Sequence, residues 1–179
     1  MQPDRSQARQ WCQPGEDPQR VLQEDFRGEK RLLIMAMDFN GIAFWELLPP
    51  GTTCTGVIYK DFLANNFETW LSGRRRGKIV LLHDNARPHK ANVVKQFLAE
   101  NNIQLWKHPA YSSDISPLDY GCFSIVKRRL RGIHHHNWEQ LEQVLRETVY
   151  DLNNQGAIRA VRDLPHRWQL AINADGQYL

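Results

Sequence analysis

The stretch KIVLLHDNARPH, residues 78–89, sets the fold class of this chain. Its apolar run IVLL has the length of a strand and leads directly into His83 and Asp84. Unbroken apolar runs of this kind are typical of strands that are buried on both faces. Ligands of α/β sheets gather at the carboxyl ends of strands, so Asp84 stands where a functional carboxylate is expected.

The segments around this strand alternate between strand and helix patterns. Upstream, two apolar runs flank Asn40-Gly41, the strongest short hairpin signal. The predicted order is a hairpin (32–37 and 42–48), a helix (57–72), a strand (78–84), a helix closing near 101–102, a strand (103–108) and helices from Ser116, from Asn137 and over roughly 164–174. This order indicates a mixed α/β sheet flanked by helices.

The composition excludes several classes of protein. The 179 residues fit one domain or one domain with an extension, and 41% apolar and 24% charged residues are typical of globular proteins. No apolar run reaches the roughly 18 residues of a transmembrane helix, and no secretory signal is visible. The widely spaced Cys12, Cys54 and Cys122 indicate a reduced intracellular compartment. The net charge of +3 permits a nucleic-acid partner without requiring one.

Asp119 is the second carboxylate of interest. Ser116 is predicted to cap a helix with Pro117 in its first position, which places Asp119 where the helix dipole favours negative charge. Two carboxylates with open oxygens suit magnesium or manganese, and paired metal ions can drive phosphodiester cleavage. Taken singly, Asp84 is better explained as a turn or cap residue, and Asp119 as half of a capping box with Ser116.

The segments HDNARPH (83–89) and HPAYSSDISPLDY (108–120) resemble the two signature segments of the mariner superfamily of DNA transposases. The resemblance implies a ribonuclease-H-like fold in which Asp84 and Asp119 are catalytic, metal-binding carboxylates. The 34 residues between them match the mariner branch, although Ser113 stands where the family usually has Pro. The likeness extends through ELLPPGTT (46–53) to LPHRWQLAINADGQYL (164–179).

The resemblance also indicates that the chain consists of an N-terminal arm and a catalytic domain. Residues 1–30, with Pro14-Gly15, match an extended arm between the family's first two strands, and residues 31–179 match the catalytic domain. We therefore expect the sheet to lack its first strand, with the first catalytic Asp upstream of Met1. Loss of that central strand would expose the edges of its neighbours. Asp38 is matched to the hairpin turn, and a role as a substitute ligand is the alternative.

Basic residues near these segments are candidates for DNA contacts, because each can neutralise phosphates, although a solvated face explains them equally well. His83 and His108 are expected to hydrogen-bond, and the tract His134–His136 is a weak metal signal. The candidate DNA-binding residues are Arg74, Arg75, Arg76, Arg87, His89, Lys90, Lys127, Arg128, Arg129 and Arg131.

Two functions remain open. The first is a nuclear transposase catalytic domain that uses Mg²⁺ or Mn²⁺ for phosphodiester cleavage and strand transfer on duplex DNA, dimeric in the intact enzyme and inactive as this fragment. The second is a decayed or domesticated transposase fragment that serves as a non-catalytic DNA- or protein-binding module. The expected absence of one metal-binding carboxylate distinguishes the two functions. Loss of a charge-stabilising group lowers the rate of an enzyme by orders of magnitude, whereas a binding module does not need it.

Overall fold

The computed structural model describes residues 31–72, 77–131, 138–155 and 157–179. The arm over residues 1–30, Arg74, Arg75, Arg76 and the segment 132–137, which contains the three consecutive histidines and the expected helix cap Asn137, therefore lie outside the described residues. None of the helices in the described part is long and apolar enough to span a bilayer.

The hairpin forms where it was predicted. Strand β1 (Leu33–Asp38) pairs antiparallel with β2 (Gly41–Leu47), with a register shift between Ala36 and Met37. Gly41 has a φ of 117°, a conformation that side chains other than glycine rarely adopt. The Asp38 Oδ1 accepts from the backbone N–H of Asn40 at 2.7 Å, and its Oδ2 accepts from the Trp70 indole at 2.7 Å. Asp38 is therefore a turn residue, as the resemblance implied.

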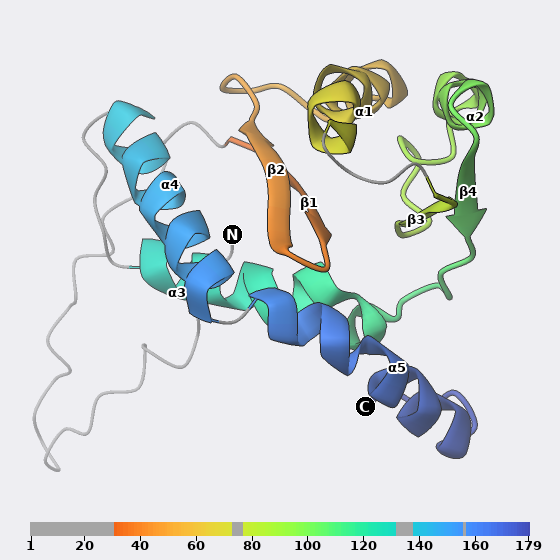
Figure 1. The fold of residues 1–179 in the computed structure, drawn as a ribbon. Helices are drawn as coiled ribbons and strands as arrows, with labels where there is room; N and C mark the ends of the chain where they lie inside the picture. Colours follow the sequence, from red (N-terminus) through yellow and green to blue (C-terminus); the bar gives the residue numbers. More distant parts are fainter. Residues whose placement is uncertain (1–30, 73–76, 132–137, 156) are drawn as a thin grey trace, which may run out of the picture.

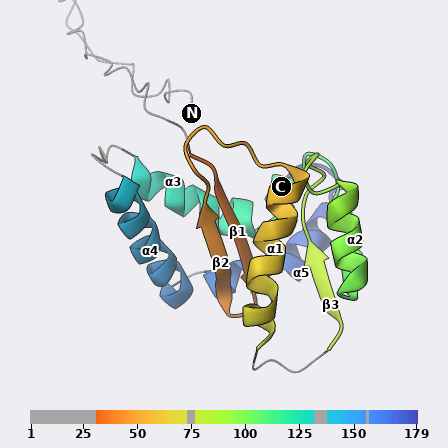
Figure 2. The same cartoon turned by 90° about the horizontal axis from the view of Figure 1, so that it is seen from above.

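Strand β3 (Ile79–Leu82) and strand β4 (Ile103–Trp106) form a second, parallel pair joined by helix α2 (Asn92–Glu100). Among the described residues, the four strands thus make two separate two-stranded sheets and not one continuous mixed sheet. Figure 1 shows the hairpin and the β3–β4 pair standing apart, with α1 and α2 on one side, and Figure 2 shows the hairpin apart from β3. Since β1 and β3 are not partners, each keeps an edge that no described strand pairs.

Helix α1 (Gly56–Leu71) covers one side of both sheets. Thr55 starts it by accepting the backbone N–H of Ile58 on its hydroxyl at 3.3 Å. Its Phe62 is 1% exposed and lies 5.1 Å, ring to ring, from Phe44 of β2. The same core takes in Leu81 of β3 and residues of α2, so the two sheets are held by a shared apolar layer. Burial of one such aromatic side chain stabilises the fold by roughly 1.5–3 kcal/mol.

Helices α3 (Ser124–Leu130), α4 (Trp138–Gln155) and α5 (Ala157–Asn173) pack around the hairpin away from α1. Asn153 of α4 clamps β2: its Oδ1 accepts from the Ile42 N–H at 2.7 Å, and its Nδ2 donates to the Ile42 carbonyl at 3.1 Å. The last helix was predicted to begin near Leu164, and it begins seven residues earlier because Ala157 and Ala160 are buried against the core. Pro165 therefore lies inside the helix.

Candidate functional site

Asp84 lies in the tight turn that follows β3. Its side chain is 62% exposed, and its Oδ1 accepts from the backbone N–H of Ala86 at 3.0 Å. The Nδ1 of His89 lies 2.7 Å from the same Oδ1. The pair is within ion-pair distance, but it is not aligned as a hydrogen bond, so the buried Nδ1 has no hydrogen-bond partner among the described residues. The other oxygen of Asp84 accepts no hydrogen bond from the described residues and stays open for a ligand.

Three rings lie beneath this carboxylate. Tyr59 of α1 is 5% exposed, and its hydroxyl lies 3.0 Å from the Nδ1 of His83. The rings of His83 and His89 stack at 4.7 Å with an interplanar angle of 10°, and the Tyr59 ring lies 4.1 Å from that of His89. His83 was predicted to hydrogen-bond, which is confirmed, whereas no sequence signal marked Tyr59.

Burial controls the charge of these rings. Burial, and then the neighbouring His89, lower the pKa of His83 to about 4, although Asp84 acts in the opposite direction. Burial, followed by the charge of Asp84, raises the pKa of Tyr59 above its usual value. Near neutral pH, Tyr59 therefore carries its proton and His83 is a neutral ring, so the hydroxyl donates to the Nδ1 lone pair.

Asp119 lies at the exposed start of a helix, as predicted. A short 3₁₀ turn, η2 (Ser113–Ile115), leads through Ser116 and Pro117 into a π-helix, η3 (Leu118–Phe123), which continues into α3. The carbonyl of Ser116 accepts from the N–H groups of Asp119 and Tyr120 at 3.0 and 3.1 Å. These are backbone bonds of the first helical turn, and no capping hydrogen bond to the Ser116 hydroxyl is found among the described residues, so the predicted side-chain cap is not formed. The Asp119 carboxylate faces solvent at the positive end of the helix.

The start of η3 is held in place by contacts with residues of α5, which lie about 40 residues or more later in the sequence. The Tyr120 hydroxyl donates to the carbonyl of Ala160 at 2.5 Å, and the Arg167 guanidinium lies 3.9 Å from the centre of the Tyr120 ring. Arg167 also donates to the carbonyl of Asp114 at 2.8 Å. Burial raises the pKa of Tyr120 to about 12, against the opposing effect of Arg167, so the hydroxyl stays a donor. The position of Asp119 is therefore fixed by α5.

One side chain ties the two signature segments together. The Asn85 Nδ2, next to Asp84, donates to the carbonyl of His108 at 2.6 Å. His108 is 9% exposed, and its Nδ1 lies 2.8 Å from the carbonyl of Pro109, so it hydrogen-bonds as expected. Within the described ranges, no hydrogen bond or ion pair joins Asp84 to Asp119, and no group of three or more His, Cys, Asp or Glu side chains is arranged to hold a metal ion.

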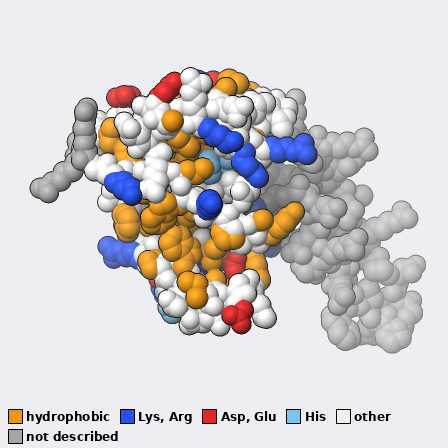
Figure 3. Space-filling model, turned by 90° about the vertical axis from the view of Figure 1, so that its right-hand side faces the viewer, with side chains coloured by type: hydrophobic (Ala, Val, Ile, Leu, Met, Phe, Trp, Pro, Cys, Tyr) orange, Lys and Arg blue, Asp and Glu red, His pale blue; other side chains and the backbone are white. Residues whose placement is uncertain are grey.

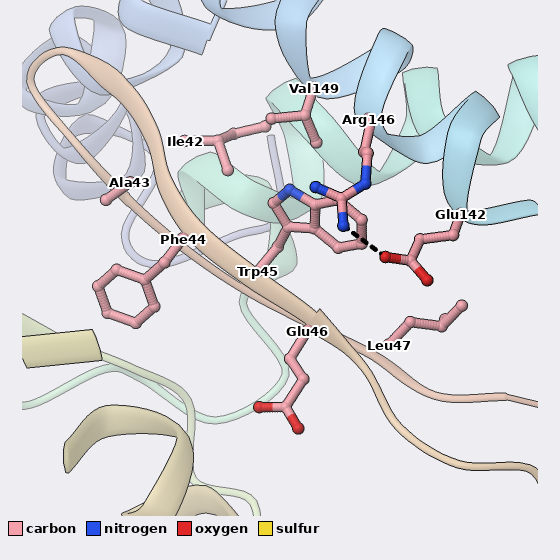
Figure 4. A pocket seen from close by; sticks show the side chains of 9 residues that line it. All are labelled: Ile42, Ala43, Phe44, Trp45, Glu46, Leu47, Glu142, Arg146 and Val149. Carbon is pink, nitrogen blue, oxygen red and sulfur yellow. Dashed lines mark hydrogen bonds and ion pairs between the residues drawn. The ribbon is translucent and has the colours of Figure 1, made fainter. Parts of the chain in front are cut away.

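Two of the hollows on the described surface differ in their relation to the candidate site. One adjoins the signature segments and is mainly apolar, with the rings of Trp106 and Trp168 lying 5.6 Å apart in its wall. The other runs along β2 beside α4 and contains neither candidate aspartate. Figure 4 shows that Arg146 there points toward Glu142, at 2.6 Å, and lies against Trp45. The hollow along β2 is therefore not part of the candidate site.

The basic candidates differ in their surroundings. Arg87 and Lys90 are exposed on the turn that carries Asp84, whereas His89 is half-buried beneath it. Arg129 is paired with Asp151 at 2.6 Å. On the face shown in Figure 3, Lys and Arg side chains are spread among hydrophobic ones and do not form one patch. Exposed candidates on the described helix end are Lys127, Arg128 and Arg131, and those outside the described residues are Arg74, Arg75 and Arg76.

Comparisons with known proteins agree on one family. The sequence profile of the family described as DDE superfamily endonuclease matches residues 1–144. The mariner Mos1 transposase of Drosophila mauritiana is 28% identical over 174 residues, which are 94% of this chain and 50% of Mos1. The chain thus spans about half the length of that relative.

Solved structures of Mos1 share the fold. Its catalytic domain with raltegravir and Mg matches with a TM-score of 0.80 at 30% identity, covering 85% of this chain and 78% of that one. The Mos1 paired-end complex with Mn matches with a TM-score of 0.85 at 27% identity, covering 95% of this chain and 51% of that one. The predicted ribonuclease-H-like α/β class is therefore confirmed.

Proposed function

The chain belongs to the DDE superfamily endonucleases, and from this premise we propose that Asp84 and Asp119 are two carboxylates of a divalent-metal site for phosphodiester cleavage and strand transfer. The proposal rests on the hydrogen bonding of the Asp84 carboxylate. One oxygen accepts from the Ala86 N–H, and the other accepts no hydrogen bond from the described residues. A hard cation with oxygen ligands, Mg²⁺ or Mn²⁺, fits this donor set. The Mos1 structures named with Mg and with Mn support the same choice.

Asp84 and Asp119 would each have a defined role in binding the metal ion. Asp84 presents its open oxygen from a turn that the Ala86 N–H fixes. Asp119 presents its carboxylate from a helix start that Tyr120 and Arg167 hold. A bound cation would supply charge neutralisation at the phosphate and an activated nucleophile.

Duplex DNA, including transposon ends, is the proposed substrate, since a Mos1 match is a paired-end complex. Arg87 and Lys90 beside Asp84, and Lys127 and Arg128 on the Asp119 helix, are the proposed phosphate contacts. We propose that the reaction takes place in the nucleus and that the intact enzyme acts as a homodimer. DNA binding by the chain is expected to be non-specific and to weaken steeply with salt, because phosphate contacts release counterions. Binding that salt leaves unchanged, measured by fluorescence anisotropy, would contradict this.

We propose that these two aspartates are an incomplete ligand set, because two-metal sites use further carboxylates and the described ranges contain no group of three or more His, Cys, Asp or Glu side chains placed to hold a metal ion. The chain alone is then expected to nick DNA slowly or not at all. The test is nicking of supercoiled plasmid with Mg²⁺ or Mn²⁺, using Asp84→Asn as the control. Robust nicking that disappears in Asp84→Asn would overturn the expectation of inactivity and support the metal site.

A non-catalytic DNA- or protein-binding module is the second candidate function. The same observation favours it, since a fold with an incomplete ligand set can still present its basic side chains. The two candidates differ in one measurement. Salt-sensitive DNA binding that is indifferent to Mn²⁺ and to Asp84→Asn supports the module, whereas binding or cleavage that changes with both supports the metal site.

A further inference from the structure

We infer that Tyr59 is a positioning residue for Asp84, acting through the stacked pair His83 and His89. The inference rests on the proposed metal-binding role of Asp84 and adds how α1 orients that carboxylate. Tyr59 does not touch Asp84 itself in the described contacts; it acts on the two rings that flank and underlie the turn.

The contacts form a continuous series from α1 to the carboxylate. The Tyr59 hydroxyl lies 3.0 Å from His83 Nδ1, which fixes the orientation of that ring. His83 stacks in parallel on His89 at 4.7 Å, and Tyr59 supports the His89 ring from the side at 4.1 Å. His89 Nδ1 then lies 2.7 Å from Asp84 Oδ1. Each ring thus restricts the rotation of the next.

The backbone makes this arrangement stiff. A β-carbon added at Gly56 would lie 2.3 Å from the Cβ of Ala91, so the start of α1 is pressed directly against the end of the turn. The turn itself is closed by the N–H of His89 donating to the carbonyl of Ala86 at 3.1 Å. Because α1 and the turn meet without a gap, the reach of the Tyr59 hydroxyl to His83 is set by the fold.

The buried nitrogen of His89 explains why Asp84 is oriented one way. The buried His89 Nδ1 lies 2.7 Å from Asp84 Oδ1, so the His89 ring limits the directions in which this oxygen can turn. Together with the hydrogen bond from the Ala86 N–H, this close contact restricts the rotation of the carboxylate. The other oxygen accepts no hydrogen bond from the described residues and stays available to a cation.

The test measures Mn²⁺ binding to the whole chain by electron paramagnetic resonance, with thermal unfolding recorded for every variant. Tyr59→Phe keeps the ring and removes only the hydroxyl. It should raise the Kd for Mn²⁺ about threefold to tenfold, as expected for loss of one hydrogen bond that orients a ligand, with a nearly unchanged Tm. Tyr150→Phe, at a side chain 70% exposed on α4, is the matched control and should bind like the wild type.

Asp84→Asn separates the inference from the proposed function. If Asp84→Asn abolishes binding and Tyr59→Phe leaves the Kd unchanged, the inference is wrong and the metal site stands. If the wild type takes up no Mn²⁺ at millimolar concentration, or Asp84→Asn binds equally well, the proposed function fails and the inference with it.

Two further readouts do not depend on the stability of one variant. Long-range ¹H–¹⁵N spectra should show His83 as a single tautomer with Nδ1 unprotonated in the wild type and as a mixture in Tyr59→Phe. An unchanged tautomer would overturn the inference. His89→Gln, which retains an N–H donor, should also keep more Mn²⁺ affinity than His89→Leu, and equal losses would contradict a role for that nitrogen.

Discussion

Replacing Arg167 by Met tests how α5 seats the helix that carries Asp119. The guanidinium donates to the carbonyl of Asp114 at 2.8 Å and covers the Tyr120 ring at 3.9 Å. Met keeps much of the apolar stem but removes the charge and the donors. A hydrogen bond from a charged group contributes about 1.5–3 kcal/mol and a partly exposed cation–π contact about 0.5–1 kcal/mol. Since Arg167 is half-buried, we expect a loss of roughly 2–3 kcal/mol in the free energy of unfolding.

Urea unfolding at neutral pH, with equal slopes for all variants, measures this loss. Arg159→Met on the same helix is the matched control. Arg159 is 86% exposed and lies 3.7 Å from Asp163, so its pair should contribute less than about 0.5 kcal/mol. If both substitutions cost the same, or if Arg167→Met costs less than about 0.5 kcal/mol, the network around Tyr120 does not hold this helix start.

Two other predictions follow from the described contacts. Asn153→Ala should cost about 2–4 kcal/mol in urea unfolding, because it leaves the buried N–H and carbonyl of Ile42 unpaired, whereas Asn154→Ala at the exposed neighbouring position should be almost neutral. Burial and His89 lower the pKa of His83 from 6.5 to about 4, so the unfolded chain binds more protons between these values. In metal-free buffer, the free energy of unfolding should therefore fall by about 1–2 kcal/mol as the pH drops through this window, after allowance for solvent screening, and His83→Gln should remove that part of the slope. A rise in stability on acidification would contradict the assignment.

Local signals predicted the elements of the fold well. Asn40-Gly41 placed the hairpin turn, and apolar periodicity placed α1 and the βαβ unit around α2. Ser116 and Pro117 placed the helix that opens at Asp119. These predictions succeed because each rests on backbone preferences over a few residues. The start of α5 was missed because burial of Ala157 and Ala160 outweighs the local effect of Pro165.

The supports of the candidate site could not be predicted in the same way. Periodicity predicted that Phe62 and Leu63 face inward, but it did not single out Tyr59 or its contact with His83, 24 residues away. Arg167 lies 53 residues from Asp114, and no local pattern pairs them. Such contacts depend on how α1 and α5 pack, so they follow from tertiary structure and not from spacing. The sequence could nominate the two aspartates without showing what holds them.

The π-helix η3 accounts for the exposure of Asp119. In a regular α-helix, residues advance by about 100°, so Asp119 and Val126, seven positions apart, would lie within roughly 20° of each other on one face. Val126 is 3% exposed in the core, and a regular helix would therefore turn Asp119 inward with it. The wider turn over Leu118–Phe123 holds about one additional residue and rotates the preceding side chains by roughly 100°. Asp119 thereby faces solvent while Cys122 and Val126 stay buried. The irregular turn therefore reconciles a core-facing helix with an accessible carboxylate at its start.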